Sequence, residues 1–250
     1  MQEETLDEII NGHLYVFQKK RGYRFSLDSL LIAHYFFLKQ SKNVLDLGCG
    51  SGIILLILAK RFPHINFTGL DIQEELVELA RKNVNFNKLE QRIKVVEGDA
   101  RKIKNVFPAN SFDAVIFNPP YRKLNSGRIN PQMEKAIARH EIKGSLKDFI
   151  KAAKYLLKQE GKVFTIYPAK RLVELIMLFR KNSIEPKRMK PVYSDNMSAA
   201  EFVLFEGRKG SGEEIKFEQP LIIYDRNKKY TADMADIFNE LARFPGAAAD

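Results

Sequence analysis

The sequence has little of what several common protein classes require. Cys49 is the only cysteine among 250 residues, which excludes an intrachain disulfide and a cluster of thiolate metal ligands. No signal peptide opens the chain, and no apolar run is long enough to cross a bilayer, so we expect a cytoplasmic protein without a membrane partner. The histidines also lack the spacing of metal ligands, so no metal is expected: His13, His34, His64 and His140.

Acidic residues are outnumbered. The chain has 31 Asp and Glu against 41 Lys and Arg, for a formal net charge of +10. This balance favours a polyanionic partner, with nucleic acid ahead of a membrane surface, although a merely soluble basic protein has the same composition. The length of 250 residues and the hydrophobic fraction of 45% suit one large globular domain or one domain with an extension.

Between residues 42 and 168, short apolar runs alternate with longer amphipathic segments. This alternation predicts an α/β fold with a mostly parallel sheet and helices on both faces. Strands are expected at residues 44–47, 65–71, 93–97, 112–117 and 161–167. Helices are expected at residues 53–61, 73–87, 145–157 and 170–180.

The segments on either side extend this core. Residues 15–25 alternate well enough for a hairpin with Gly22 near its turn, and Ser26 can cap a helix over residues 27–38. After the core, we expect an antiparallel hairpin at one sheet edge, an extended segment and a short helix, at residues 184–206, 215–224 and 232–241. The resulting single domain divides into a leader, a core and an extension, with a cloning remnant after it: residues 1–40, 42–207, 208–241 and 242–250.

A glycine-rich loop joins the first core strand to the next helix. Its sequence, Asp46-Leu-Gly-Cys-Gly-Ser-Gly52, has the spacing G-x-G-x-G, which differs from the dinucleotide fingerprint G-x-G-x-x-G. Glycine lets the backbone turn tightly and approach a ligand closely, so Gly48 and Gly50 are candidate binding residues. A turn with no ligand is the alternative interpretation.

Acidic residues mark three successive strands. Asp46 lies two residues before the first glycine, Asp71 ends the second strand and Asp99 follows the third. A carboxylate in the second position can accept hydrogen bonds from both hydroxyls of a ribose, and one in the third from an adenine amino group. Each acid could instead be a cap or a turn residue. Three of them beside a glycine loop predict a nucleoside cofactor.

The fourth core strand ends in the tetrapeptide Asn118-Pro119-Pro120-Tyr121. Proline donates no backbone hydrogen bond, so pairing must stop there, at the sheet edge where α/β proteins bind ligands. The Asn118 side-chain oxygen and the Pro119 carbonyl can accept two amino hydrogens, and Tyr121 can stack on a flipped-out base. As the amine attacks a methyl donor its nitrogen gains positive charge, so both hydrogen bonds strengthen in the transition state. A structural turn is the alternative.

Basic residues follow this tetrapeptide closely. Residues 122–140 contain five cations beside the one acid Glu134: Arg122, Lys123, Arg128, Lys135 and Arg139. A second cluster holds Lys187, Arg188 and Lys190, and a third holds Arg226, Lys228 and Lys229. Such groups can grip phosphates and so position a nucleic acid without reading its sequence, although some will be ordinary solvated surface residues.

The glycine loop, the three acids and the tetrapeptide together resemble the S-adenosylmethionine-dependent methyltransferases of the Rossmann-like class, over residues 43–167. The resemblance implies a Rossmann-like sheet with a reversed last strand and S-adenosylmethionine as the cofactor. It also implies which residues contact the cofactor. Asp71 and Ile72 would contact the ribose, and Asp99 and Ala100 the adenine. The methionine portion would lie against Asp46, Gly48 and Gly50, and the methyl group near Asn118.

The leader and the tail extend the resemblance. The stretches Tyr23–Leu31 and Pro220–Thr231 are similar to those of the family that methylates the N6 amine of an adenine next to the anticodon of tRNA(Val). The resemblance implies a tRNA substrate, and it places Asp28 near the amino-acid end of the cofactor.

Two alternatives stay open. Asn-Pro-Pro-Tyr also resembles the enzymes that methylate a glutamine amide in release factors, but those usually carry a substantial N-terminal helical domain, and only about forty residues precede the first core strand here. The third hypothesis is a non-catalytic RNA-binding scaffold that kept the fold. The intact Asp71, Asp99 and Asn118 argue against it.

Overall fold

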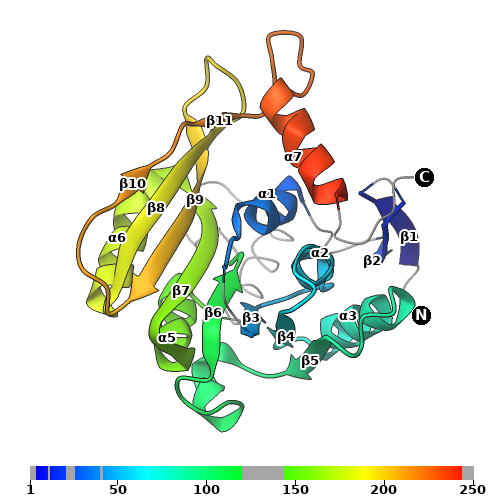
Figure 1. The fold of residues 1–250 in the computed structure, drawn as a ribbon, viewed down its shortest axis with the longest axis vertical. Helices are drawn as coiled ribbons and strands as arrows, with labels where there is room; N and C mark the ends of the chain where they lie inside the picture. The colour runs from blue at the N-terminus through cyan, green and yellow to red at the C-terminus, as the bar shows by residue number, and fades with distance from the viewer. Residues whose placement is uncertain (1–3, 11, 21–25, 40–41, 120–143, 244–250) are drawn as a thin grey trace, which may run out of the picture.

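A twisted mixed sheet forms the centre of the protein (Figure 1). The computed structural model describes residues 4–10, 12–20, 26–39, 42–119 and 144–243. Within them, the nine strands of this sheet run in the order β10-β8-β9-β7-β6-β3-β4-β5, with β11 also paired to β8. The predicted α/β fold with a mostly parallel sheet is confirmed.

The parallel half of the sheet consists of consecutive core strands. Their apolar side chains are buried on both faces, which explains why they read as continuous hydrophobic runs rather than as alternating ones. The strands are β3 (Asn43–Leu47), β4 (Asn66–Asp71), β5 (Ile93–Glu97), β6 (Phe112–Phe117) and β7 (Leu157–Pro168).

Helices cover both faces of this sheet. One face carries α1 (Leu27–Tyr35), α2 (Ile53–Arg61), α3 (Glu74–Phe86) and α7 (Ala232–Ala242). The other carries the short helix η1 (Ala100–Asn105), α5 (Leu146–Leu156) and, after the turn η2 (Ala169–Arg171), α6 (Leu172–Lys181). None of the helices in the described ranges combines the length and the apolar character needed to cross a membrane.

The expected C-terminal hairpin is present. It consists of β8 (Ile184–Tyr193) and β9 (Ala200–Lys209), which pair antiparallel, and β9 also pairs antiparallel with β7. The second strand of the hairpin therefore lies inside the sheet, next to the parallel half. The extended segment that follows contributes only β10 (Lys216–Phe217) and β11 (Leu221–Ile222), both parallel to β8.

A leader hairpin is present earlier in the chain than predicted, and the second half of the predicted one, residues 21–25, lies outside the described residues. The observed hairpin pairs β1 (Glu4–Ile9) with β2 (Leu14–Lys19), and its turn contains Gly12 at φ +80° rather than Gly22. The sequence Asn11-Gly12 is itself a strong hairpin signal, because both residue types tolerate positive φ. The helix after Ser26 also ends at Tyr35 instead of Leu38, since Phe36 takes an extended conformation.

Candidate active site

The strand register brings the predicted site residues to one edge of the sheet. Leu47 pairs with Leu70, so Gly48 and Asp71 are the next residues of adjacent strands. Asp46 pairs with Ile116, so Gly48 and Asn118 each follow two residues later. Parallel strands lie about 4.8 Å apart, so Asp71 and Asn118 are separated by two strand spacings, or roughly 10 Å.

The glycine loop after β3 turns on hydrogen bonds to the neighbouring strand. The backbone N–H groups of Gly48 and Cys49 both donate to the carbonyl of Leu70, over 2.7 and 3.0 Å. Gly48 has φ +82°, and a Cβ there would stand 3.1 Å from the ring of Phe149 on α5. A side chain at this position is therefore opposed both by backbone strain and by lack of space.

Asp71 is buried at the end of β4 and fixed by backbone donors. Its Oδ2 accepts a hydrogen bond from the Gly50 N–H and its Oδ1 accepts one from the Gln73 N–H, each over 3.0 Å. Each carboxylate oxygen can accept two hydrogen bonds. The carboxylate is thus oriented by the loop, and its acceptor capacity suits the paired hydroxyls of a ribose. Ile72, the next residue, is partly exposed.

Asp46 has a different environment. It is fully buried within β3, and no group in the described part of the chain donates a hydrogen bond to either of its carboxylate oxygens. Burial, with a smaller contribution from the charge of Asp71, raises the pKa of Asp46 to about 8. A buried carboxyl without a donor suits a ligand that brings a positive charge to this loop.

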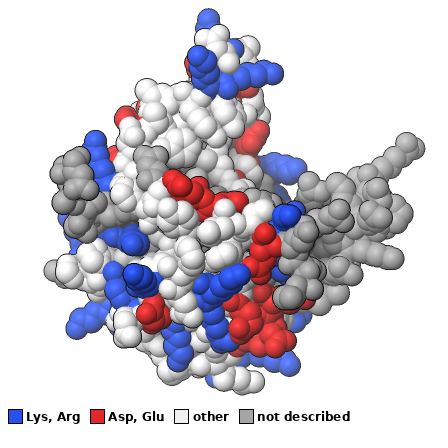
Figure 2. All heavy atoms as spheres, turned by 90° about the vertical axis from the view of Figure 1, so that its right-hand side faces the viewer, with Lys and Arg blue, Asp and Glu red and all other residues white. Residues whose placement is uncertain are grey.

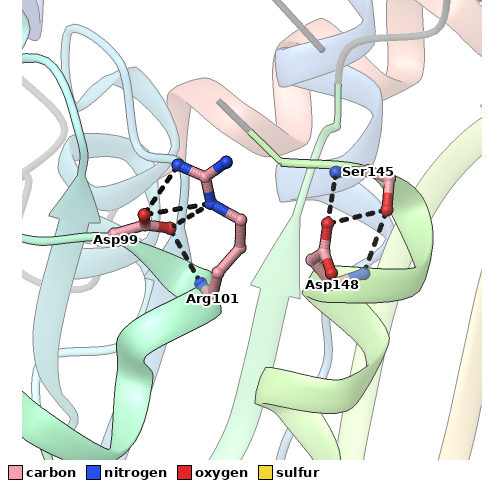
Figure 3. Close-up of polar contacts among 4 residues, drawn as sticks. All are labelled: Asp99, Arg101, Ser145 and Asp148. Atoms are coloured by element: carbon pink, nitrogen blue, oxygen red, sulfur yellow. Dashed lines mark hydrogen bonds and ion pairs between the residues drawn. The ribbon is translucent and has the colours of Figure 1, made fainter. Parts of the chain in front are cut away.

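Asp99 caps the helix η1 and is bound by Arg101 (Figure 3). Its Oδ1 accepts from the Arg101 backbone N–H over 2.8 Å, and the guanidinium donates to both carboxylate oxygens, with Nη2 2.7 Å from Oδ2. These hydrogen bonds lower the pKa of Asp99. Ala100, the first residue of η1, is almost completely buried.

The start of α5 borders this pair. Ser145 and Asp148 form a capping box, in which the Ser145 hydroxyl and backbone N–H both donate to Asp148 Oδ2. Figure 3 shows the two polar pairs on neighbouring segments, and α5 packs against η1. The hydrogen bond to Asp99 and its charge, with a smaller contribution from the Asp148 carboxylate, raise the pKa of Arg101. Arg101 therefore lies in the field of two acids, which the sequence analysis did not foresee.

The tetrapeptide begins where expected. Asn118 follows the last residue of β6 and is partly exposed, and Pro119 is buried. Pro120 and Tyr121 lie outside the described residues, as do the basic residues after them: Arg122, Lys123, Arg128, Lys135 and Arg139. Their roles in stacking and phosphate binding stay predictions.

Asn83 on α3 is a residue that the sequence analysis missed. Its side-chain oxygen accepts from the Phe17 N–H over 2.7 Å, and its amide donates to the carbonyls of Phe17 and Ser51. It thus joins the leader hairpin to the glycine loop. An asparagine on the buried face of a predicted amphipathic helix was the available signal. Asp28 lies in the first turn of α1, which packs against α2.

The second basic cluster is largely engaged within the protein. Arg188 forms ion pairs with Glu206 and Glu218, over 2.8 and 2.6 Å, and its guanidinium lies over the ring of Tyr35. Lys187 donates to the carbonyls of Gly212 and Glu213. Their contact with RNA stays a prediction. At Arg188, an RNA phosphate would have to compete with Glu206 and Glu218 for the guanidinium.

Comparisons with known proteins identify the family of this chain. Residues 21–182 match the methyltransferase small domain family. A tRNA1(Val) (adenine(37)-N6)-methyltransferase of Vibrio cholerae is 31% identical over 69% of this chain and 73% of the relative. One of the same name from Tolumonas auensis is 25% identical over 92% of this chain and 97% of the relative.

A solved structure agrees at the level of the fold. A predicted O-methyltransferase from Agrobacterium tumefaciens superposes with a TM-score of 0.70 at 21% identity, over 88% of this chain and all of that one. The family resemblance seen in the sequence is therefore confirmed. The chain belongs to the methyltransferase small domain family and groups with relatives named tRNA1(Val) (adenine(37)-N6)-methyltransferase.

Proposed function

We infer that this protein transfers a methyl group from S-adenosylmethionine to the exocyclic N6 amine of an adenine in tRNA. The names of its relatives specify position 37 of tRNA1(Val), and we propose the same target, beside the anticodon, for this chain. The observation that carries the proposal is the register of the sheet, in which Asp71, Gly48 and Asn118 stand side by side at one edge.

The described residues suit the proposed cofactor. Asp71 can accept from the ribose hydroxyls, because the backbone donors of Gly50 and Gln73 orient its carboxylate at the end of β4. Asp99 follows β5, one strand beyond, where an adenine amino group would meet its carboxylate. Asp46 supplies a buried carboxyl group at the loop that would surround the cationic methionine end, and the positive charge of that end would favour its ionisation.

The chemistry needs positioning more than a strong base. S-adenosylmethionine, when bound, supplies a methyl group activated by the positive charge of its sulfonium. The lone pair of the adenine amine is delocalised, so the Asn118 side-chain oxygen and the Pro119 carbonyl would hold its two hydrogens and favour the attacking geometry. Both hydrogen bonds strengthen as charge develops on nitrogen, so these residues stabilise the transition state more than the bound substrate.

The leader and the tail belong to the same domain as the core in this proposal. Asn83 bonds the leader hairpin to the core, and α7 packs against α1. We therefore propose that residues 1–241 act as one methyltransferase domain.

Methyl transfer to tRNA tests the proposal directly. Purified protein is incubated with labelled S-adenosylmethionine and bulk tRNA from cells that lack the protein, and the tRNA is then digested to nucleosides. We expect new N6-methyladenosine, which mass mapping of tRNA fragments assigns to one position. If no N6-methyladenosine forms while a control methyltransferase is active in the same assay, the inference is wrong.

Two further arms separate the alternatives. Labelling of a release factor, with none of tRNA, would identify a glutamine methyltransferase instead. Calorimetric titration with S-adenosylmethionine tests the non-catalytic scaffold, which would bind tRNA but show no binding of the cofactor.

A further inference from the structure

A short basic hairpin joins β11 to α7. It consists of residues 224–230, and we call it the basic hairpin. Tyr224 and Tyr230 form an antiparallel bridge at its base, and their rings stack with centroids 5.2 Å apart. Three of the five residues between them are cations: Arg226, Lys228 and Lys229.

Hydrogen bonds hold the backbone of the basic hairpin in one conformation. The Asp225 N–H donates to the Lys229 carbonyl over 2.8 Å, and Asp225 Oδ1 accepts from the N–H groups of Asn227 and Lys229. At the base, the Tyr224 N–H donates to the carbonyl of Ser194, just after β8. The tip is therefore built before any partner arrives, which reduces the entropy lost on binding.

The charge of the tip is unbalanced. All three cations are exposed, and in the described part of the chain none of them forms an ion pair. The one acid of the hairpin, Asp225, is turned toward backbone donors. Two exposed acids, Asp233 and Asp236, lie on α7 rather than on the tip. Arg188, by contrast, forms ion pairs with Glu206 and Glu218.

An exposed aromatic ring adjoins the cations. Tyr230 keeps 49% of its surface exposed although it packs on Tyr224 and, edge to face, on Phe238. A fixed ring beside several cations is an arrangement that proteins use to contact nucleic acid, because the ring can stack while the cations neutralise phosphates.

The basic hairpin projects from the body of the protein. Figure 1 shows it as the loop at the top, between β11 and α7, whereas β3 and β4 lie near the middle. Figure 2 shows its projecting tip dominated by Lys and Arg, while acids and cations are mixed over much of the face below. A partner held at the tip must therefore extend well beyond the catalytic edge.

We propose that the basic hairpin grips the sugar–phosphate backbone of the RNA substrate at a distance from the target base. This inference rests on the proposed function. RNA is favoured over an acidic protein because the tip places charged donors beside an exposed ring on which a base can stack. The hairpin would set affinity and orientation without reading sequence, as phosphate contacts do.

Replacing the three cations tests the proposal. The variant Arg226→Gln/Lys228→Gln/Lys229→Gln is compared with a control that removes three exposed cations elsewhere, Lys94→Gln/Lys151→Gln/Lys154→Gln. Affinity for full-length tRNA is measured from low to moderate salt. We expect the hairpin variant to bind about tenfold or more weakly and the slope of log K against log salt to fall by about 2 to 3, because each lost phosphate contact removes about one unit.

Kinetics and a matched rescue complete the test. KM for tRNA should rise while kcat and the affinity for S-adenosylmethionine stay unchanged, and Arg226→Lys/Lys228→Arg/Lys229→Arg should behave like the original protein. If the hairpin variant keeps the affinity and the salt slope of the control, the proposal is overturned, and the cations are solvated or serve an acidic protein. Failure of the proposed function looks different, because the original protein would then not methylate tRNA at all.

Discussion

The guanidinium of Arg101 binds both carboxylate oxygens of Asp99, the acid that we assign to the adenine of the cofactor. The side chain of Arg101 is 43% exposed, whereas that of Asp99 is only 15% exposed. The pair thus lies at the border of the candidate site, with the more exposed partner, Arg101, on the solvent side. An adenine amino group that bonds to Asp99 must share the carboxylate with this guanidinium.

Removing the guanidinium should therefore strengthen cofactor binding. We expect Arg101→Gln to tighten the affinity for S-adenosylmethionine only about two- to fivefold, because exposed ion pairs are weak. Calorimetry measures it, with Asp99→Asn as the comparison, which should weaken binding. Weaker binding by Arg101→Gln would mean instead that Arg101 orients Asp99 for the ligand.

Asp46 should make stability depend on pH. Its pKa is raised to about 8 by burial, against the ordinary value of 3.8 in the unfolded chain. Below pH 3.8 both states hold the proton, and the associated stability is complete. Between pH 4 and 8 the unfolded chain releases the proton while the folded protein retains it, so this stability is progressively lost.

Asp46→Asn cannot ionise and should abolish this loss. In the cofactor-free protein, the unfolding free energy of the variant relative to the original should rise by about 2–3 kcal/mol between pH 5 and pH 7, at about 1.4 kcal/mol per pH unit. Urea unfolding at the two pH values measures it. Any cost of burying the amide is the same at both, so a difference that does not change with pH would contradict the assigned pKa.

Asn118→Ala should remove catalysis and keep the cofactor site. Losing one preorganised acceptor for the developing charge should lower kcat by about 10²–10³-fold. Affinity for S-adenosylmethionine should change little, since Asp71 and the glycine loop are untouched. Asn85→Ala, on the exposed side of α3, is the matched control and should behave as the original protein. Unchanged methyl transfer in Asn118→Ala would refute the proposed mechanism while leaving the family assignment intact.

Gly48→Ala should damage the loop itself. The added Cβ would meet Phe149 at 3.1 Å in a residue with φ +82°. We expect a loss of about 1–3 kcal/mol in stability, together with weaker cofactor binding. Thermal unfolding and calorimetry measure the two effects. If Gly48→Ala/Phe149→Leu recovers part of both losses, the ring is the obstacle.

The core was predictable because each of its segments carries its own signal. The bounds of β5 and α2 follow from apolar runs flanked by charged residues or glycine, and β6 ends where Asn118-Pro119 begins. The site edge was predictable too, because parallel strands that end in Asp71 and Asn118 must end on the same side. The pairing of β1 with β2 was not predicted, although Asn11-Gly12 between them is a typical hairpin turn sequence.

What the sequence could not show are pairings between distant segments. Arg188 reads as one of three cations in a basic cluster, yet Glu206 and Glu218 come to it from 18 and 30 residues away. Arg101 is close to Asp99 in sequence, but only the turn of η1 brings its guanidinium onto the carboxylate. Such outcomes depend on tertiary geometry, which composition and spacing do not contain.

The hydrogen bonds of Asn83 should couple the local unfolding of the leader hairpin to that of the glycine loop. Because one side chain bonds both Phe17 of the leader and Ser51 of the glycine loop, the two segments should lose protection from hydrogen exchange together. A ligand held by the loop would then slow exchange at amides of β2, which it does not touch. Hydrogen exchange at β2 would therefore depend on whether the site is occupied, and Asn83→Ala would remove that dependence.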